Sequence, residues 1–368
     1  MTQRLPPCLT PIDTALAALL RSVDPVTPVA LPLTEAAGCI SAGMPLLPAY
    51  PSRDIAVVDG WALRASDLVG ASSYSPLPLT ELPAWVEAGD VMPVGYDCVL
   101  DADAVEVSGP LAQVMAEGVP GQGVGRSGSD IAESSPAAAA GYPVGAAALL
   151  LARVAGREKL NVRRPRLRIV NVPDATATME MIAELARAVG LDVSAHEAGA
   201  RDATSIAEAL DVSACDLLLT IGGSGIGRRD AVVTALAQCG DVLAYGLALQ
   251  PGRTAAVGRL GKVPVVVLPG SPGRAFAAWL ALVLPLIDKL SMRQPRRTVT
   301  LPLARKIASN VGIAEIALLA WEHQAWTPLA VGEWPLQAIA RADAWLLVSG
   351  SSEGFAAGMP IDAYLIRE

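Results

Sequence analysis

Three turns rich in glycine and proline carry residue types that bind anionic ligands. The first, Gly222-Gly-Ser-Gly-Ile-Gly227, follows the apolar run 216–221, which predicts a buried strand. The other two are Gln250-Pro-Gly-Arg253 and Pro269-Gly-Ser-Pro-Gly273. Backbone N–H groups in such turns can bind a phosphate or another anion, especially next to a helix N-terminus. We expect the three turns to meet at the carboxyl edge of one sheet, where open α/β folds bind ligands.

These features also have ordinary structural explanations. Each turn alone fits a tight turn of any α/β domain. The turn at 222–227 is not a P-loop, because no Gly-Lys-Ser/Thr follows it, and it lacks the G-x-G-x-x-G spacing of dinucleotide sites. The densest basic run, Arg163-Arg-Pro-Arg-Leu-Arg168, fits either the solvated start of a strand or an arginine cluster near an anion.

The composition excludes several classes of function. The chain has 368 residues, 52% of them hydrophobic, and a net charge of −8. An acidic chain without a large Lys/Arg cluster is a poor nucleic-acid binder. Five scattered cysteines without a C-x-x-C pair, and two distant histidines, argue against a zinc or iron–sulfur site. No signal-like or membrane-spanning stretch is evident, so we expect a soluble, cytoplasmic protein that binds neither membrane nor nucleic acid.

The pattern of elements predicts a multidomain α/β protein. Strand-like and helix-like segments alternate from 167 to 287, which predicts a doubly wound, largely parallel sheet. Residues 10–23 predict a helical arm with Thr10 as N-cap, and alternation over 80–107 predicts a small β module. The expected parts are an N-terminal arm and linker (1–50 plus 125–165), an inserted β module (51–124), the α/β domain (166–293) and a β-rich C-terminal module (294–368).

The ordered set of motifs is more specific than any single turn. Gly-Gly-Ser-Gly-Ile-Gly-x-x-Asp230, then Gln-Pro-Gly-Arg253, then Leu-Pro-Gly-Ser-Pro272 resembles the molybdopterin-binding domain of the molybdopterin molybdenumtransferase family, which includes MoeA and the E domain of gephyrin. Asp59-Gly-Trp-Ala is similar to the family's Asp-Gly-Tyr-Ala, and the closing segment 338–362 is similar to the family's end. The likeness covers nearly the whole chain, in the family's order.

The resemblance implies a site for adenylylated molybdopterin, with molybdate as a substrate and Mg²⁺ as a cofactor that assists the reaction. The carboxylates that match family motifs are candidate catalytic residues: Asp59, Asp97, Asp130 and Asp230. Of these, Asp59 and Asp230 are the candidate Mg²⁺ ligands, since a hard cation needs carboxylate oxygens. The residues implied to bind molybdopterin are Gly222, Gly223, Ser224, Gly225, Gly227, Pro251, Gly252, Arg253, Pro269, Gly270, Ser271 and Pro272.

The same aspartates allow structural roles. Asp59 fits a turn residue that caps its own backbone, and Asp130 fits a turn residue in a mobile linker. Asp230 fits an acid in the first turn of a helix, where the helix dipole favours negative charge.

The chain also departs from the family pattern. The family's Asp-Glu pair after the first α/β strand is Asp174-Ala175 here, so one carboxylate is lost. Arg253 replaces a lysine, which keeps the charge and adds a fork suited to phosphate. Ser271 replaces an asparagine and loses the amide's separate donor and acceptor.

Two functions follow from the resemblance. The first is insertion of molybdenum from molybdate into adenylylated molybdopterin with release of AMP, which the preserved aspartates favour. The alternative is an impaired relative that binds or delivers molybdopterin or the finished cofactor to one molybdoenzyme, which the lost carboxylate favours. An unrelated nucleotide-binding α/β protein explains none of the flanking modules. The family further implies a homodimer, with a molybdopterin adenylyltransferase and a recipient molybdoenzyme as protein partners.

Overall fold

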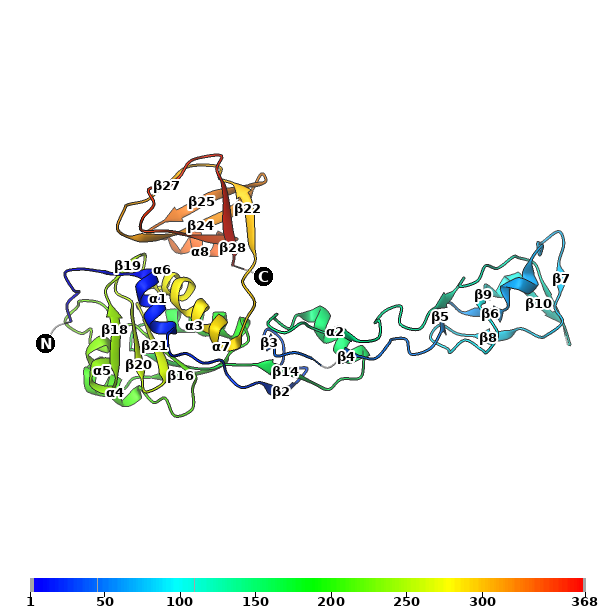
Figure 1. Cartoon of the computed structure of the whole chain (residues 1–368), viewed down its shortest axis with the longest axis horizontal. Coiled ribbons are helices and arrows are strands. Elements are labelled where there is room, and N and C mark those ends of the chain that lie inside the picture. Colours follow the sequence, from blue (N-terminus) through cyan, green and yellow to red (C-terminus); the bar gives the residue numbers. More distant parts are fainter. Residues whose placement is uncertain (1–2, 45, 109, 367–368) are drawn as a thin grey trace. The chain divides into compact units, whose positions relative to one another are not determined.

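The computed structural model describes residues 3–44, 46–108 and 110–366. The chain forms two compact units, whose elements are labelled in Figure 1. The first unit comprises Met1–Ala42, Ala140–Gly145 and Lys159–Glu368, and the second comprises Gly43–Ala139 and Ala146–Glu158. The finer boundaries of the four expected parts stay a prediction. In the described ranges, no helix has both the length and the apolar character needed to span a membrane.

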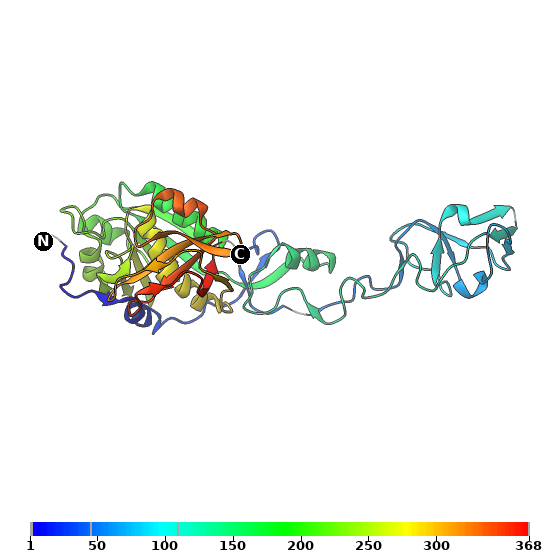
Figure 2. The same cartoon turned by 90° about the horizontal axis from the view of Figure 1, so that it is seen from above.

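A six-stranded, mostly parallel sheet is the framework of the first unit (Figures 1 and 2). Its strands, in spatial order, are β16 (Asp192–Glu197), β15 (Arg166–Asn171), β17 (Leu217–Ile221), β21 (Val263–Leu268), β20 (Ala256–Leu260) and β18 (Asp241–Tyr245). The first four run parallel, whereas β20 pairs antiparallel with both of its neighbours, β21 and β18. The predicted parallel sheet is therefore confirmed for four strands, and the antiparallel edge was not foreseen.

Helices cover both faces of this sheet because its central strands are apolar on both sides. All five residues of β17 are buried, as expected of a parallel strand covered twice. One face packs against α1 (Ile12–Leu20), α3 (Thr176–Ala188), α6 (Pro272–Ala278), the π-helix η3 (Trp279–Val283) and α7 (Leu284–Ser291). The other face packs against α4 (Ala203–Ala209) and α5 (Val232–Cys239).

The N-terminal segment differs from its prediction. Thr10 does not cap a helix, because Thr10–Pro11 forms the short strand β1, which pairs in parallel with Leu247–Ala248. Helix α1 begins at Ile12 without a side-chain cap. Its buried residues Ile12, Ala15 and Leu19 belong to the core beneath the six-stranded sheet. The helix therefore packs as part of the α/β core and does not form an arm.

A seven-stranded mixed sheet forms the second layer of the first unit. Its strands are β1, β19 (Leu247–Gln250), β24 (Ala314–Glu322), β26 (Ala344–Val348), β28 (Pro360–Leu365), β22 (Thr298–Pro302) and, paired with β24, β25 (Ala325–Val331). The C-terminal region is β-rich, as predicted, but β1 and β19 join its sheet from distant parts of the chain. The turn at Gln250–Arg253 thus ends a strand of this sheet, so the expectation that all three turns lie on one sheet is wrong.

The remaining elements are short. The first unit also contains β2 (Val29–Pro32), β3 (Ile40–Ser41), β14 (Lys159–Arg163), β23 (Ile307–Ala308), β27 (Gly354–Phe355) and α8 (Leu336–Arg341). In its described residues the second unit is built from small antiparallel sheets, as predicted for 80–107, with one α-helix and two short 3₁₀-helices. Its elements are β4 (Leu46–Leu47), β5 (Ile55–Ala56), β6 (Gly60–Leu63), η1 (Ala65–Leu68), β7 (Leu77–Pro78), β8 (Ala84–Val86), β9 (Cys98–Leu100), η2 (Ala102–Ala104), β10 (Val105–Ser108), β11 (Leu111–Val114), β12 (Val124–Gly125), β13 (Ser135–Pro136) and α2 (Ala146–Val154).

The central strand gives a test of the core. Leu219 is fully buried in β17, so Leu219→Ala should destabilise the first unit by about 2–5 kcal/mol through lost burial and the cavity left behind. Leu336 is 63% exposed on α8, and Leu336→Ala is the matched control with little expected effect. Urea denaturation followed by far-UV circular dichroism measures both, and equal midpoints for the two variants would contradict the assigned core.

Candidate functional site

The glycine loop, defined as Gly222–Gly227, follows β17 directly and needs glycine at its first two positions. Gly222 has φ +90° and Gly223 has φ +66°, a region that side chains disfavour. A Cβ atom on Gly223 would lie 2.8 Å from Cγ2 of Val232, at the start of α5. The chain therefore turns sharply from the strand towards the helix in a space that admits no side chain.

The carbonyl oxygens of the glycine loop are held by two distant residues. The Gln3 side-chain amide donates to the Gly223 oxygen at 3.3 Å and to the Gly225 oxygen at 2.8 Å, and accepts from the Val233 N–H at 2.9 Å. The Tyr245 hydroxyl donates to the Ser224 oxygen at 3.1 Å. Burial raises the pKa of Tyr245, so this donor stays protonated at neutral pH. No local sequence pattern pointed to either residue.

The backbone amides of the same loop are left available. Among the described residues, no acceptor is found for the N–H groups of Gly223 to Ile226. Arg228 and Arg229 follow the loop, and both are exposed. Consecutive backbone N–H groups in left-handed and turn conformations form a concave anion site, and the two arginines add positive charge. The Ser224 side chain is buried and lies 3.4 Å from the Thr254 hydroxyl, so it faces the protein interior.

The ends of three parallel strands meet at this loop. The Gly222 N–H donates to the Leu268 oxygen at 3.0 Å, and the Val172 N–H donates to the Ile221 oxygen at 2.9 Å. The Thr178 hydroxyl of α3 donates to the Gly270 oxygen at 2.6 Å. The turns after β15, β17 and β21 therefore lie together at the carboxyl edge of the sheet, and Pro269–Pro272 adjoins the glycine loop.

Ala175 lies within this junction. It is buried, and a Cβ atom on Gly222 would lie 3.2 Å from its methyl group. The position that carries a glutamate in the family pattern is thus a small apolar contact between the turns.

The turn Gln250–Arg253 reaches the glycine loop from the seven-stranded sheet. Thr254 contacts Ser224 as described above, and Arg253 is exposed beside it. Arg253 lines a pocket of about 250 Å³ together with Arg274 of α6 and Glu333. Arg274 and Glu333 lie 4.0 Å apart and are both largely exposed. Two guanidinium groups on one small pocket suit a phosphate or another oxyanion, and Arg274 was not singled out in the sequence.

Asp230 holds the glycine loop in place. Its Oδ2 accepts from the Gly227 N–H at 2.9 Å, and its Oδ1 lies 3.3 Å from Nη2 of Arg201. Helix α5 begins only at Val232, so the alternative that Asp230 lies in the first turn of a helix is wrong. Arg201 was also missed, because it precedes α4 and becomes a neighbour of Asp230 only in the folded unit.

The other three candidate carboxylates lie in the second unit, and no contact joins them to one another within the described residues. Asp59 Oδ1 accepts from the Ala88 N–H at 2.8 Å. Asp97 Oδ1 accepts from the Ala65 N–H at 2.8 Å and so caps η1. Asp130 is exposed and accepts from the neighbouring Ser129 hydroxyl at 3.3 Å. Asp59 and Asp97 thus bond to backbone N–H groups that are distant in the chain, and Asp130 bonds to a neighbouring side chain, so none of these three contacts caps the aspartate's own backbone. A catalytic role for the three stays a prediction.

Magnesium requires several oxygen ligands that are not already engaged. In the described part of the chain, no group of three or more His, Cys, Asp or Glu side chains is placed to hold a metal ion. Both Asp230 oxygens are engaged, one of them by a cation. The residues of the described chain therefore do not fit a magnesium site at Asp230, and a metal role for Asp59 stays a prediction.

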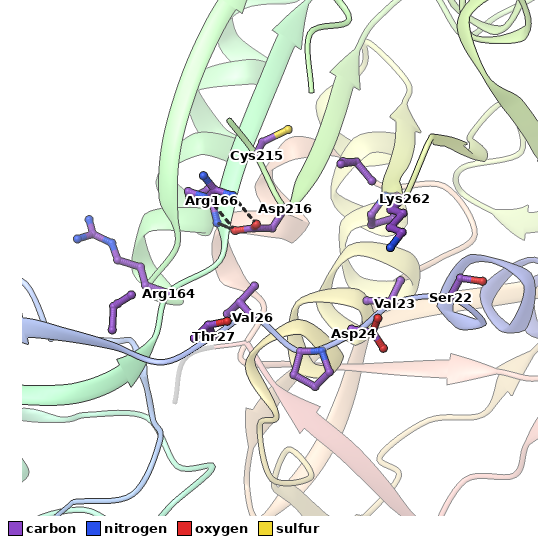
Figure 3. Close-up of a pocket in the computed structure, with 14 residues that line it drawn as sticks. Ser22, Val23, Asp24, Val26, Thr27, Arg164, Arg166, Cys215, Asp216 and Lys262 are labelled. Carbon is purple, nitrogen blue, oxygen red and sulfur yellow. Dashed lines mark hydrogen bonds and ion pairs between the residues drawn. The ribbon is translucent and has the colours of Figure 1, made fainter. Parts of the chain in front are cut away.

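A pocket of about 590 Å³ lies at the opposite, amino edge of the same sheet (Figure 3). It contains part of the basic run 163–168, but these arginines are ion-paired. Arg166 makes two side-chain hydrogen bonds to Asp216, of 2.8 and 3.1 Å, and Arg164 lies 3.3 Å from Glu35. Burial acts to raise the pKa of Asp216, but hydrogen bonds from Arg166 outweigh it and lower the pKa. The ion pairs favour the structural interpretation of the basic run.

The fold and the loop define an α/β protein with a glycine loop at the carboxyl edge of its parallel strands, and sequence profiles agree with this class. The profile described as "MoeA N-terminal region (domain I and II)" matches residues 10–156. The profile described as "Probable molybdopterin binding domain" matches residues 171–289, which include all three turns. The chain belongs to the MoeA family.

Individual relatives are distant but cover most of the chain. Molybdopterin molybdenumtransferase 2 of Mycobacterium tuberculosis is 27% identical over 362 residues, which cover 86% of this chain and 88% of that protein. The molybdopterin molybdenumtransferase of Haemophilus influenzae is 26% identical and covers 76% of this chain and 77% of its own. The crystal structure of a MoeA molybdopterin biosynthesis protein from Pyrococcus horikoshii superposes with a TM-score of 0.73 at 21% identity, over 98% of this chain and 100% of that one. That structure supports the fold.

The glycine loop gives a paired test. Gly223→Ala should cost about 1–2 kcal/mol for its left-handed backbone, and more because the new methyl group would meet Val232. Gly261 has a similar φ of +59° with nothing within 4 Å, so Gly261→Ala isolates the backbone cost. We expect a lower melting temperature and faster amide hydrogen exchange at 222–227 for Gly223→Ala than for Gly261→Ala. Equal behaviour of the two variants would refute the described packing.

Proposed function

We propose that this protein binds molybdopterin, in its phosphorylated or adenylylated form, at the glycine loop and acts in molybdenum cofactor biosynthesis as a molybdopterin molybdenumtransferase. The observation that carries the proposal is the loop itself: Gln3 and Tyr245 bind the carbonyl oxygens of Gly223 to Gly225, and the N–H groups of Gly223 to Ile226 find no acceptor among the described residues. Such a loop binds an anion without rearrangement. The profile match over 171–289, described as a probable molybdopterin binding domain, supports the phosphate of a pterin as that anion.

The surrounding residues supply what this ligand needs. The loop amides hold the phosphate, and Arg253 and Arg274 bind a second anionic group in the adjoining pocket. That group is the adenylyl phosphate or molybdate, which is a substrate of the proposed reaction. Asp230 orients the loop through the Gly227 N–H and does not itself need to touch the ligand. The homodimer and the protein partners implied by the family remain proposals.

A second function is favoured by a specific observation. Where the family pattern has a glutamate, Ala175 is packed against the glycine loop, and Asp230 is engaged by Arg201. The carboxylates that could assist insertion are therefore fewer than in the family pattern. A protein that binds molybdopterin or the finished cofactor and delivers it to one molybdoenzyme needs the anion site but not these carboxylates.

A turnover assay decides between the two functions. Full-length protein is mixed with adenylylated molybdopterin, magnesium and molybdate, and AMP release and cofactor formation are followed while pterin binding is measured in parallel. We expect AMP release that depends on molybdate. Binding without AMP release would establish the delivery protein, and absence of binding would overturn both functions.

Arg253 gives a separate test of the ligand's place. Arg253→Ala should weaken binding of the phosphorylated pterin by about tenfold, because one charge-assisted hydrogen bond to an anion is lost. Arg341→Ala is the control, since Arg341 is an exposed arginine of α8 paired with Glu322 at 3.6 Å. Isothermal titration calorimetry measures both affinities. An unchanged Kd for Arg253→Ala would place the ligand elsewhere.

A further inference from the structure

Arg201 joins the two loops that frame the candidate site. It lies between β16 and α4, and its Nη1 donates to the Pro173 oxygen at 2.6 Å and lies 3.2 Å from Asp174 Oδ2. Its Nη2 lies 3.3 Å from Asp230 Oδ1. One guanidinium therefore bridges the turn after β15 to the segment after the glycine loop.

The bridge is partly shielded from water. The Arg201 side chain is 27% exposed and the Asp230 side chain 18% exposed, although Asp174 is 79% exposed. Charge-assisted hydrogen bonds are stronger than neutral ones, and removing one partner would leave a half-buried carboxylate unpaired. Asp174 is also held at φ +78°, a conformation that costs energy and persists only where neighbours enforce it. The carbonyl contact at Pro173 supplies that constraint next to it.

On the side opposite Arg201, Asp230 contacts the glycine loop. Its Oδ2 binds the Gly227 N–H, and a Cβ atom on Gly225 would lie only 2.6 Å from the same oxygen. The carboxylate is thus pressed against the glycine loop on one side and bonded to Arg201 on the other. Movement of Arg201 would release Asp230 and, with it, the last turn of the loop.

We propose that Arg201 is a built-in cation of this site: it occupies the place between the Asp174 and Asp230 carboxylates that a divalent ion would need, and it positions Asp230 on the glycine loop. A divalent ion at Asp230 would have to displace a guanidinium that makes contacts to both carboxylates and to a carbonyl oxygen. Arg201 is accordingly a positioning residue. One consequence rests on the proposed function: phosphate binding at the glycine loop needs no metal ion at Asp230.

The test measures metal binding directly and requires no pterin. Mn²⁺ serves as the probe, and the concentration of free Mn²⁺ is followed by electron paramagnetic resonance during titration of the full chain. Wild type and Asp230→Asn should bind Mn²⁺ equally, because Asp230 holds none. Arg201→Ala should gain a site at least about tenfold tighter than any in the wild type, and adding Asp230→Asn to Arg201→Ala should remove it.

Two results would overturn the proposal. One is a wild-type Mn²⁺ site that Asp230→Asn abolishes. The other is a folded Arg201→Ala variant with no gain in Mn²⁺ binding. Arg168→Ala is the matched control, since Arg168 is a similarly shielded arginine paired with Asp211 at 3.4 Å on β15, and it should leave Mn²⁺ binding unchanged.

Further variants keep the test independent of folding and of the pterin proposal. Arg201→Lys retains the charge and should not gain the Mn²⁺ site. If Arg201→Ala fails to fold, the comparison of wild type with Asp230→Asn still decides whether Asp230 holds a metal. A protein that fails to bind pterin but shows this Mn²⁺ pattern would contradict the proposed function and leave the role of Arg201 standing.

Discussion

The candidate site depends on how the carbonyl oxygens of the glycine loop are bonded. A turn of six residues at the end of a buried strand exposes as many acceptors as donors, and a loop free to rotate would present both to a ligand. Gln3 and Tyr245 bind the acceptors from the protein side. The N–H groups of Gly223 to Ile226 find no acceptor in the described ranges, so the loop has a polarity of bonded acceptors and unused donors before any ligand arrives. Pre-organisation of this kind lowers the entropic cost of binding.

This polarity ties the site to the rest of the first unit. Gln3 belongs to the segment that leads into β1, and β1 pairs with β19, whose end carries Arg253. Tyr245 ends β18 at the antiparallel edge of the six-stranded sheet. The glycine loop is therefore supported by β18 of the six-stranded sheet and by the segment that leads into β1 of the seven-stranded sheet.

Local patterns in the sequence were sufficient for the elements with strong periodicity. The apolar strands β17 and β21, the helix α3 and the glycine turns were all identified within a few residues, because each depends on its own residues. Contacts between residues that are distant in the chain could not be predicted from local patterns. Thr10 resembles an N-cap, yet pairing with Leu247 makes it a strand residue. Gln3, Arg201 and Arg274 are ordinary polar residues in sequence, and they acquire a role only when folding brings them to the glycine loop or to the pocket of Arg253.

The same contacts bear on whether the site can accelerate a reaction. Around the glycine loop, arginines outnumber carboxylates, and Arg201 neutralises part of the negative charge that remains. Positive charge fixed in this way binds a phosphate equally well before and during cleavage of a phosphoanhydride. Uniform binding of this kind raises affinity without raising the rate of the bound complex. Under the proposed function, catalysis would require a group that interacts more strongly as charge develops on the leaving phosphate. Arg253 and Arg274, exposed on a small pocket beside the loop, are candidates for that group. Under the proposed function, the pocket beside the glycine loop, and not the loop alone, is therefore the place where molybdenum transfer would differ from binding of the pterin alone.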